Sequence, residues 1–251
     1  MTVLSLSGLR CSFGGVQAVR SASFACRESG ITGLIGPNGA GKSTVLNAIA
    51  GSVSPEKGAV TLDGEDISGL APYRIARKGI ARTFQIPNIF GNMTVMENLL
   101  VGARHGFIGS IRCAFWKKSA WRAWEEEHVI RARHLLQQFE MEHTEVLHGD
   151  ELSGGQRRLL EIMACLMADP KFMLLDEPMA GISPVLARRL GHYLREISRN
   201  GIPMLMVEHE LAIVEDICEV VVVMARGEVV IEGSMETIRA NKDVADAYLV
   251  G

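Results

Sequence analysis

The sequence is poor in the features that build disulfide frameworks, metal clusters and membrane spans. Its five cysteines are widely separated and form no C-x-x-C pair, and its seven histidines are just as scattered. This distribution suits a reducing compartment and argues against a zinc site. No apolar run approaches the roughly 18 residues that a membrane-spanning helix needs, and the opening residues 1–4 do not begin a signal peptide.

A large charge of one sign is also missing. The formal net charge is −3, without the basic excess that nucleic-acid-binding proteins usually carry. Hydrophobic residues make up 47% of the 251 residues, and charged residues make up 22%. A chain of this length and composition can bury a sizeable core, as one large domain or two small ones. We therefore expect a globular cytoplasmic protein that has no nucleic-acid partner.

The glycine-rich stretch 36–44 is the most informative part of the chain, and it reads GPNGAGKST. Its glycines let backbone N–H groups turn toward phosphates, Lys42 can reach the terminal phosphates as a point charge, and the Ser43 hydroxyl can hold Mg²⁺. Residues 31–35 are typical of a short buried strand, and residues 44–50 open a helix. The phosphates would therefore lie at a helix N-terminus. This arrangement predicts a site for a nucleoside triphosphate.

Short alternating runs surround this stretch. Residues 3–35 and 58–64 show the apolar–polar alternation of strands, and they predict an antiparallel layer beside the nucleotide site. Phe13 lies in that layer, next to a glycine pair. It can stack on an adenine ring, which contributes about 1 kcal/mol, or it can be a core residue. The sequence leaves both interpretations open.

The middle of the chain is helical in pattern. Thr94 and Glu97 have the spacing of a capping box before a helix over 98–101. Residues 107–140 then place apolar side chains on one helical stripe and charges on the other, which predicts an amphipathic helical subdomain. The stripe contains Trp116, Trp121, Trp124, His128, Leu135, Leu136 and Phe139. Its tryptophans fit packing inside the subdomain or a face that docks a partner.

A second glycine-rich helix start lies at residues 152–156, LSGGQ. Ser153 and Gln156 have capping-box spacing, so a helix begins here with N–H groups flanked by glycines. Such an N-terminus is a second phosphate site. Since one chain rarely needs two of these for one nucleotide, the economical explanation is that this one serves a nucleotide held mainly by another subunit.

Two apolar strands deliver charged side chains at their carboxyl ends, where parallel sheets present their chemistry. The strand 172–175 leads into Asp176 and Glu177. Asp176 is placed to bind Mg²⁺, directly or through water, and Glu177 is placed to orient or deprotonate an attacking water. The strand 204–207 leads into Glu208 and His209. A histidine in this place can sense the γ-phosphate and support that water.

The order of these elements resembles the ATP-binding cassette (ABC) family along almost the whole chain, and the LSGGQ element is the specific part. The resemblance implies an α/β fold: a RecA-like P-loop NTPase core with an antiparallel β layer (1–90 and 159–251) and an inserted α-helical subdomain (91–158), together one ABC ATPase domain. It also implies that two cassettes close face to face, with each Ser153 element capping the ATP on its partner.

The resemblance also implies roles for individual residues. Glu177 is the general base, His209 contacts the γ-phosphate, and Lys42 completes the catalytic set. Ser43, Gln85 and Asp176 hold Mg²⁺. The residues that bind ATP are Phe13, Gly36, Pro37, Asn38, Gly39, Ala40, Gly41, Lys42, Ser43, Thr44, Gln85, Ser153, Gly154, Gly155 and Gln156. Gln85 and the helical subdomain would pass the closing motion to transmembrane subunits.

A narrower resemblance, to the ATPases of branched-chain amino acid importers, lies in residues 79–85 and 90–98, the tryptophan-bearing insert and the terminal Ala247-Tyr248-Leu249. Urea and short-chain amide importers are close relatives. These systems imply a second, different ABC ATPase subunit, two transmembrane permease subunits, a solute-binding protein outside the cell and a location on the inner face of the cell membrane.

Some features leave alternatives open. The importer relatives usually have Asn where Ser183 stands, so contacts across a cassette dimer can differ there. A soluble cassette protein that acts on ribosomes or DNA is the main alternative to transport. Such proteins usually join two cassettes or carry long coiled arms, which are missing here. A small-molecule kinase would leave residues 152–156 unexplained.

Overall fold

The computed structural model describes residues 2–103 and 118–241, and their contacts divide them into two compact units. The first unit comprises residues 2–85, 171–180 and 187–241. The second comprises the described parts of Ile86–Pro170 together with Gly181–Leu186. The mixed α/β class, with an antiparallel β layer and a separate helical unit, is the predicted one.

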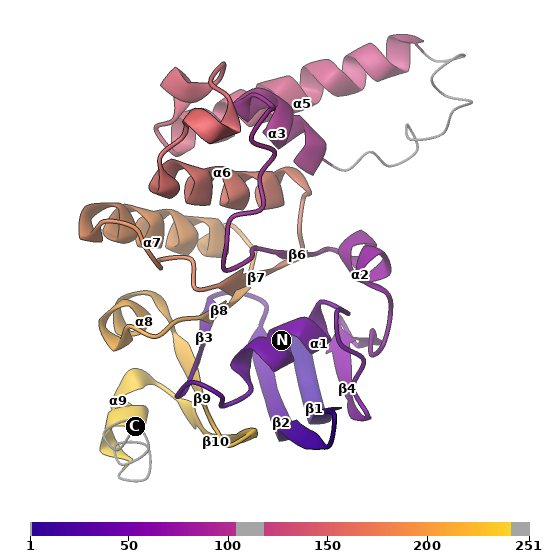
Figure 1. Ribbon diagram of the computed structural model, residues 1–251, viewed down its shortest axis with the longest axis vertical. Coiled ribbons are helices and arrows are strands. Elements are labelled where there is room, and N and C mark those ends of the chain that lie inside the picture. The colour runs from indigo at the N-terminus through magenta and orange to yellow at the C-terminus, as the bar shows by residue number, and fades with distance from the viewer. Residues whose placement is uncertain (1, 104–117, 242–251) are drawn as a thin grey trace. The chain divides into compact units, whose positions relative to one another are not determined.

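The first unit is built on one ten-stranded sheet (Figure 1). The strands follow the order β5-β4-β1-β2-β10-β9-β3-β8-β7-β6 across it. They are β1 (Thr2–Phe13), β2 (Val16–Arg27), β3 (Ile31–Ile35), β4 (Lys57–Leu62), β5 (Glu65–Asp66), β6 (Ile80–Arg82), β7 (Phe172–Asp176), β8 (Met204–Val207), β9 (Val220–Ala225) and β10 (Glu228–Gly233). The predicted strand limits 31–35 and 204–207 are confirmed.

The parallel half of this sheet aligns the strand ends that carry the predicted site. β3 pairs in parallel with β8 and β9, and β7 pairs in parallel with β8 and β6. Asp176 on β7 lies opposite Val207 on β8. Because parallel strands end at the same edge of a sheet, the residues after Ile35, Asp176 and Val207 emerge there together. All side chains of β3, β7 and β8 are buried, as expected for strands covered on both faces.

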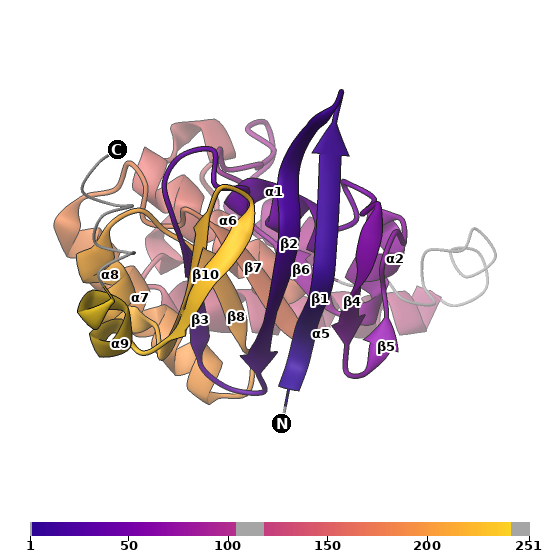
Figure 2. The same cartoon turned by 90° about the horizontal axis from the view of Figure 1, so that it is seen from below.

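The other half of the sheet is antiparallel. β1 pairs with β2 and β4, and β4 pairs with β5 (Figure 2). β9 and β10 form the predicted hairpin around Arg226 and Gly227, and β10 contacts β2 through the pair Glu228 and Ser21. The apolar faces of β1, β2 and β4 pack with Leu46 and Ile49 of helix α1 (Lys42–Ile49) in one core. Each such buried side chain contributes about 1.5–3 kcal/mol.

Further helices complete the first unit, and one of them crosses its boundary. α2 (Pro72–Lys78) begins with proline and ends at Gly79, whose φ of 112° lies in the left-handed region that helix C-termini favour. α8 (Leu211–Ile217) and α9 (Met235–Ala240) follow β8 and β10. α7 (Pro184–Arg199) starts in the second unit, because its first turn belongs to Gly181–Leu186.

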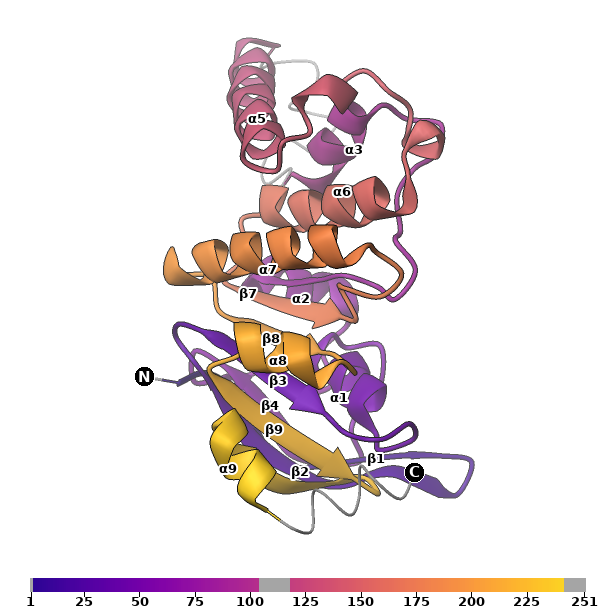
Figure 3. The ribbon, with the colours of Figure 1, turned by 90° about the vertical axis from the view of Figure 1, so that its left-hand side faces the viewer.

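In the described part of the second unit, apart from the first turn of α7, the chain forms three helices and two single 3₁₀ turns. α3 (Val95–Gly102), α5 (Lys118–Gln138) and α6 (Gly154–Met167) pack against one another (Figure 3), and the turns cover Glu142–Thr144 and Gly149–Glu151. The predicted caps are confirmed, since both reciprocal bonds of a capping box form at Thr94 and again at Ser153. By its contacts the unit covers Ile86–Pro170, compared with the expected 91–158, and it includes all of α6, which packs on α3 and α5.

Asn98 is a buried, hydrogen-bonded residue of the second unit, and the sequence pattern did not predict this role. Its side chain is 5% exposed. The amide nitrogen donates to the carbonyl oxygens of Phe90, Met93 and Thr94 at 3.0, 3.2 and 2.9 Å, and the amide oxygen accepts the N–H of Phe90 at 2.8 Å. A buried amide with all these bonds formed fixes the segment 90–94 before α3.

Two predictions at the ends of segments fall partly outside the described residues. The amphipathic region 107–140 is helical from Lys118 to Gln138, while 107–117, which includes Trp116, is not described. Residues 247–249 of the C-terminal resemblance are likewise not described. Within the described ranges, no helix combines the length and hydrophobicity needed to cross a membrane.

Candidate nucleotide-binding site

The phosphate loop connects β3 to α1 in a conformation that requires glycine at two places. Gly36 has φ 152°, and a Cβ there would lie 2.1 Å from the backbone oxygen of Met224. Gly41 has φ 99°, and its Cβ would lie 2.6 Å from the backbone oxygen of Ala18. Neither contact leaves room for a side chain, since real Cβ atoms do not approach backbone so closely. The loop is therefore packed against β9 and β2, which fixes its course.

Lys42 crosses the inside of this loop. Its ammonium donates to the carbonyl oxygens of Gly36 and Pro37 at 2.7 and 3.0 Å, and the side chain is buried. Burial lowers the pKa of Lys42, while the nearby carboxylates of Glu177 and Asp176 raise it. The lysine thus lies close to both predicted carboxylates.

The start of α1 fits a phosphate group. The N-cap residue Gly41 has no side chain to accept a hydrogen bond from the first N–H groups of the helix. Ser43, in the first turn, is exposed. Unsatisfied N–H groups, the positive end of the helix dipole and the neighbouring Lys42 ammonium together favour an anion with several oxygens.

Asp176 ends β7 and is bound by Arg82 of β6 and by Thr83, the residue after β6. Its carboxylate lies 3.1 Å from the Arg82 guanidinium, and its backbone N–H donates to the Thr83 hydroxyl at 3.2 Å. Arg82 also donates to the side-chain oxygen of Asn47 on α1 at 2.7 Å. The sequence reasoning missed Arg82 as a contact of the site. The available signal was a charged residue at the end of the short strand-like run 80–82.

The site at Asp176 suits Mg²⁺ better than it suits a metal ion whose ligands all come from the protein. No group of three histidine, cysteine, aspartate or glutamate side chains in the described ranges converges on a possible metal position. Mg²⁺ characteristically binds one or two carboxylates and takes its other ligands from substrate phosphates and water. The Asp176 carboxylate meets the carboxylate part of that requirement, while Ser43, whose hydroxyl is exposed, and Gln85 stay predicted ligands.

Glu177 follows directly and faces His209. Its Oε1 atom lies 2.8 Å from His209 Nε2, and its Oε2 atom lies 3.5 Å from Gln85 Nε2. The backbone of Glu177 has φ 49°. This left-handed conformation costs a residue with a Cβ about 1–3 kcal/mol. The side chain is 19% exposed and that of His209 is 42% exposed, so water can reach the pair.

Glu208 is the third carboxylate at this edge. It is 4% exposed, and it accepts the backbone N–H of Met179 at 2.8 Å and that of His209 at 3.3 Å. Burial raises the pKa of Glu208, the two backbone N–H bonds lower it, and the negative charges of Glu177 and Glu210 raise it further. The sequence reasoning noted Glu208 only as the neighbour of His209.

Phe13 lies at the end of β1 and pairs with Val16 across the hairpin. Its side chain is 50% exposed. The core interpretation of this residue is therefore wrong, because a core phenylalanine loses nearly all of its accessible surface. Stacking on an adenine ring stays a prediction.

The LSGGQ element belongs to the second unit. Ser153 caps α6 by accepting the N–H of Gln156 at 3.3 Å, and Gln156 Oε1 accepts the N–H of Ser153 at 2.9 Å. Ser153 and Gly154 are exposed. A Cβ on Gly155 would lie 2.4 Å from a methyl carbon of Leu186. The N-terminus of α6 is thus accessible at its first residues and packed at Gly155.

Comparisons with known proteins place the chain in a family. Its residues 19–180 match the family described as ABC transporter. The chain belongs to the ABC transporter family. It is an ATP-binding cassette, and therefore an ATPase of an ABC transporter.

The cassette is similar to named transport proteins over its full length. It is 38% identical to the high-affinity branched-chain amino acid transport ATP-binding protein BraF of Pseudomonas aeruginosa, over 98% of this chain and 97% of that protein. It is 37% identical to a probable branched-chain amino acid transport ATP-binding protein LivG of Archaeoglobus fulgidus, over 99% and 96%. Among solved structures, the ADP conformation of MJ1267, an ATP-binding cassette of an ABC transporter, matches with a TM-score of 0.87 and 34% identity over 100% of both chains.

Ser183, the predicted departure from the importer pattern, has a structural explanation in this cassette. Its hydroxyl accepts the N–H of Leu186 at 3.3 Å, so it caps the start of α7 just before Pro184. Serine and asparagine are both preferred at helix N-caps. A serine can therefore replace the asparagine of the relatives without loss of the cap.

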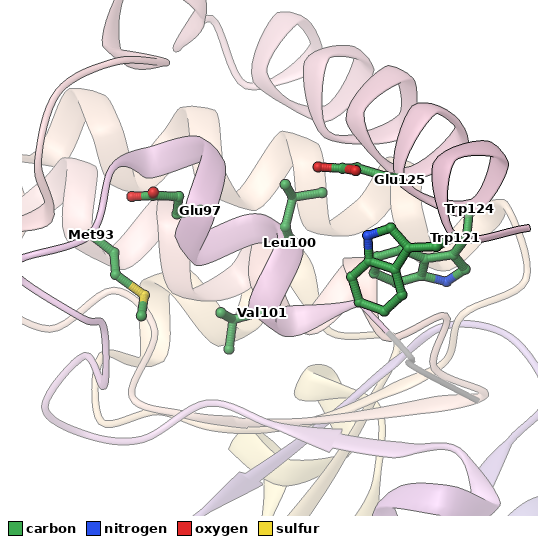
Figure 4. A pocket seen from close by; sticks show the side chains of 7 residues that line it. All are labelled: Met93, Glu97, Leu100, Val101, Trp121, Trp124 and Glu125. Atoms are coloured by element: carbon green, nitrogen blue, oxygen red, sulfur yellow. The ribbon is translucent and has the colours of Figure 1, made fainter. Parts of the chain in front are cut away.

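Trp121 and Trp124, the two tryptophans within the described ranges, lie on α5 beside a pocket in the helical unit (Figure 4). Trp121 is 41% exposed, while Trp124 stacks on His128 with the ring centres 4.2 Å apart. The pocket has a volume of about 260 Å³, and it is lined by Met93, Glu97, Leu100, Val101, Trp121, Trp124 and Glu125. Within the described part of the predicted stripe, the C-terminal residues Leu135, Leu136 and Phe139 are buried. Packing and partner docking both remain interpretations for Trp121.

Proposed function

We propose that this cassette is the ATP-hydrolysing subunit of an importer that takes up branched-chain, hydrophobic amino acids. The observation that carries the proposal is the full-length similarity, at 34–38% identity, to proteins named as branched-chain amino acid transport ATP-binding proteins. Import of urea or short-chain amides is the second candidate. Because substrate contacts belong to other subunits, residues of this chain do not choose between the two solutes.

In the proposed mechanism, the phosphate loop and Lys42 bind the phosphates, and Phe13 stacks on the adenine. The N–H groups of residues 36–44 and the Lys42 ammonium stabilise the negative charge that shifts during phosphoryl transfer. Ser43, Asp176 and Gln85 would hold Mg²⁺, which would supply positive charge to offset the negative charge of the phosphates.

Glu177 orients and deprotonates the attacking water in this proposal. Its carboxylate is within hydrogen-bond distance of His209 and partly exposed, which is the geometry that a general base needs. His209 holds the carboxylate in place and contacts the γ-phosphate. The two consecutive carboxylates have different partners, Arg82 for Asp176 and His209 for Glu177, and we propose different roles for them.

Assembly completes the proposal. We infer that Ser153, Gly154, Gly155 and Gln156 cap the ATP that a second cassette holds, as a heterodimer or a homodimer. Two transmembrane permease subunits bind the pair on the cytoplasmic face of the membrane, and a solute-binding protein delivers the solute outside the cell. Both units of this chain, residues 1–251, then act as one ABC ATPase domain.

The catalytic part is tested with Glu177→Gln in the assembled complex. We expect ATP binding within about twofold of the wild type and a loss of turnover of about 100-fold or more, because the amide cannot accept the proton of the attacking water. A closed dimer should accumulate with ATP. Hydrolysis at the wild-type rate would remove Glu177 from the role of base.

The transport part is tested by purification from detergent-solubilised membranes through a tag on this chain, followed by mass spectrometry. Recovery of a second cassette and two multi-span proteins supports the importer. ATPase stimulation of that complex by its binding protein loaded with leucine, but not with urea, supports the amino acid. Recovery of ribosomal or DNA-bound proteins with no membrane protein would overturn the importer.

A further inference from the structure

The turn after β7 is held by three consecutive residues at the end of β8. The carbonyl oxygen of Val207 accepts the N–H of Glu177 at 3.0 Å. The carboxylate of Glu208 accepts the N–H of Met179 at 2.8 Å, and His209 Nε2 lies 2.8 Å from the Glu177 carboxylate. These contacts hold the backbone on both sides of Pro178 and the side chain of Glu177.

Glu208, the middle one of these three residues, is unusual because it is a buried acidic residue. Its side chain is 4% exposed, and across the described ranges no basic side chain forms an ion pair with it. Burying a carboxyl group without an opposite charge is unfavourable. Both of its oxygens are nevertheless used, one by Met179 N–H and the other by His209 N–H. The carboxyl group therefore accepts hydrogen bonds from the backbone of the two loops that carry Glu177 and His209.

The turn needs such support because Glu177 adopts a left-handed backbone conformation, φ 49°. Residues with a Cβ keep this conformation only where their surroundings fix it. Inside the turn, the N–H of Ala180 donates to the carbonyl oxygen of Glu177 at 3.1 Å. The N–H of Met179 points out of the turn to Glu208 instead. Glu208 thus supplies a bond that the turn does not provide for itself.

We propose that Glu208 is a positioning residue for ATP hydrolysis: by binding the Met179 N–H, it holds the turn 177–180 so that the Glu177 carboxylate stays against His209. This inference rests on the proposed role of Glu177 as the base. The bond does not require a particular charge state, because a neutral carboxyl and a carboxylate both accept an N–H donor.

The first experiment measures the bond itself by amide hydrogen exchange in the full-length chain. Glu208→Ala should speed exchange at the Met179 N–H about 10-fold or more, because its acceptor is lost. Glu208→Gln should keep it near the wild-type rate, since the amide oxygen can still accept. Glu210→Gln is the matched control: it removes a neighbouring charge from an exposed residue whose side chain caps no helix N–H. Unchanged exchange in Glu208→Ala would overturn the proposal.

The second experiment measures steady-state ATP hydrolysis by the assembled complex. We expect kcat to fall about 10- to 100-fold in Glu208→Ala, the effect of a small misplacement of a reacting group, with the KM for ATP within about twofold. Glu208→Gln should recover most of kcat, and Glu210→Gln should match the wild type. If Glu208→Ala and Glu208→Gln lost the same amount of kcat, or if the KM for ATP rose as much as kcat fell, the substitutions would have damaged the site generally. Either result would overturn the proposal.

The outcomes also separate this inference from the proposed function. Faster exchange at Met179 with normal kcat in Glu208→Ala would overturn the positioning role, while the base role of Glu177 would stand. Full activity of Glu177→Gln would overturn the base role itself, and with it the link from Glu208 to hydrolysis, whatever the exchange result.

Discussion

Replacement of Arg82 by methionine should destabilise the cassette through Asp176. The Arg82 guanidinium and the Asp176 carboxylate are 3.1 Å apart, and their side chains are 11% and 10% exposed. Methionine keeps much of the side-chain volume but removes the charge and the bond to Asn47. Breaking a buried pair by removing one partner costs about 3–5 kcal/mol. Since a tenth of each group still reaches solvent, we expect about 3 kcal/mol.

Thermal unfolding without nucleotide, followed by circular dichroism, measures this loss. For a chain of this size, 1 kcal/mol lowers Tm by about 2–4 °C, so Arg82→Met should lower Tm by about 6–12 °C. Arg239→Met is the matched control. Arg239 pairs with Glu215 at 2.6 Å, but the two side chains are 61% and 43% exposed, so its loss should cost less than about 1 kcal/mol.

A double-mutant cycle with Asp176→Asn assigns the loss to the pair. If the cost of Arg82→Met comes from the Asp176 carboxylate, the double variant should be more stable than the sum of the single effects predicts, by about 2 kcal/mol. An excess of ATP and Mg²⁺ should also reduce the difference in Tm between Arg82→Met and the wild type. The reason is that a bound Mg²⁺ would give the Asp176 carboxylate a new positive partner. Additive effects, or a Tm shift below about 2 °C, would refute this reasoning.

Three further substitutions test other parts of the structure. Gly41→Ala should weaken ATP binding in calorimetric titration about 10-fold or more, because a Cβ at φ 99° would lie 2.6 Å from the Ala18 oxygen; wild-type affinity would contradict the close packing of the phosphate loop on β2. Asn98→Leu removes four hydrogen bonds to segment 90–94 and should cost about 2–4 kcal/mol in urea unfolding, and a cost near zero would mean that the segment is held by other contacts. Ser153→Arg should leave ATP binding by the isolated chain unchanged and suppress hydrolysis by the assembled complex, whereas loss of binding by the isolated chain would disprove action on a partner's nucleotide.

Local features of the sequence predicted most of the elements that present the site. Glycine and capping patterns have short range, so the start of α6 at Ser153 and the phosphate loop before α1 follow from residues within nine consecutive positions. Continuous apolar runs likewise marked β7 and β8, because buried parallel strands have no polar face.

The contacts that sequence reasoning missed join distant positions. Arg82 lies 94 residues before Asp176, and the two meet only because β6 and β7 pair in parallel with Arg82 opposite Leu174. Met179 lies 29 residues before Glu208. No periodicity encodes a pairing of this kind, because it depends on strand order and register. The exposure of Phe13 was not predictable from the local pattern either. The alternation around it fitted a strand, but its exposure depends on its place at the end of a hairpin.

The position of the helical unit in the chain has an evolutionary consequence. β6 and β7 are parallel neighbours, with Ile80 opposite Phe172, and such a pair always requires a crossover connection of a dozen residues or more. Residues 86–170 provide that crossover. Its length has no bearing on the strand pairing, so insertions, deletions or exchange of this segment can leave the hydrolytic edge of the sheet unaltered. On the proposed function, changes in this stretch outside residues 153–156 would alter the contacts of the cassette with its membrane partners, while the proposed hydrolytic residues of the first unit are inherited unchanged.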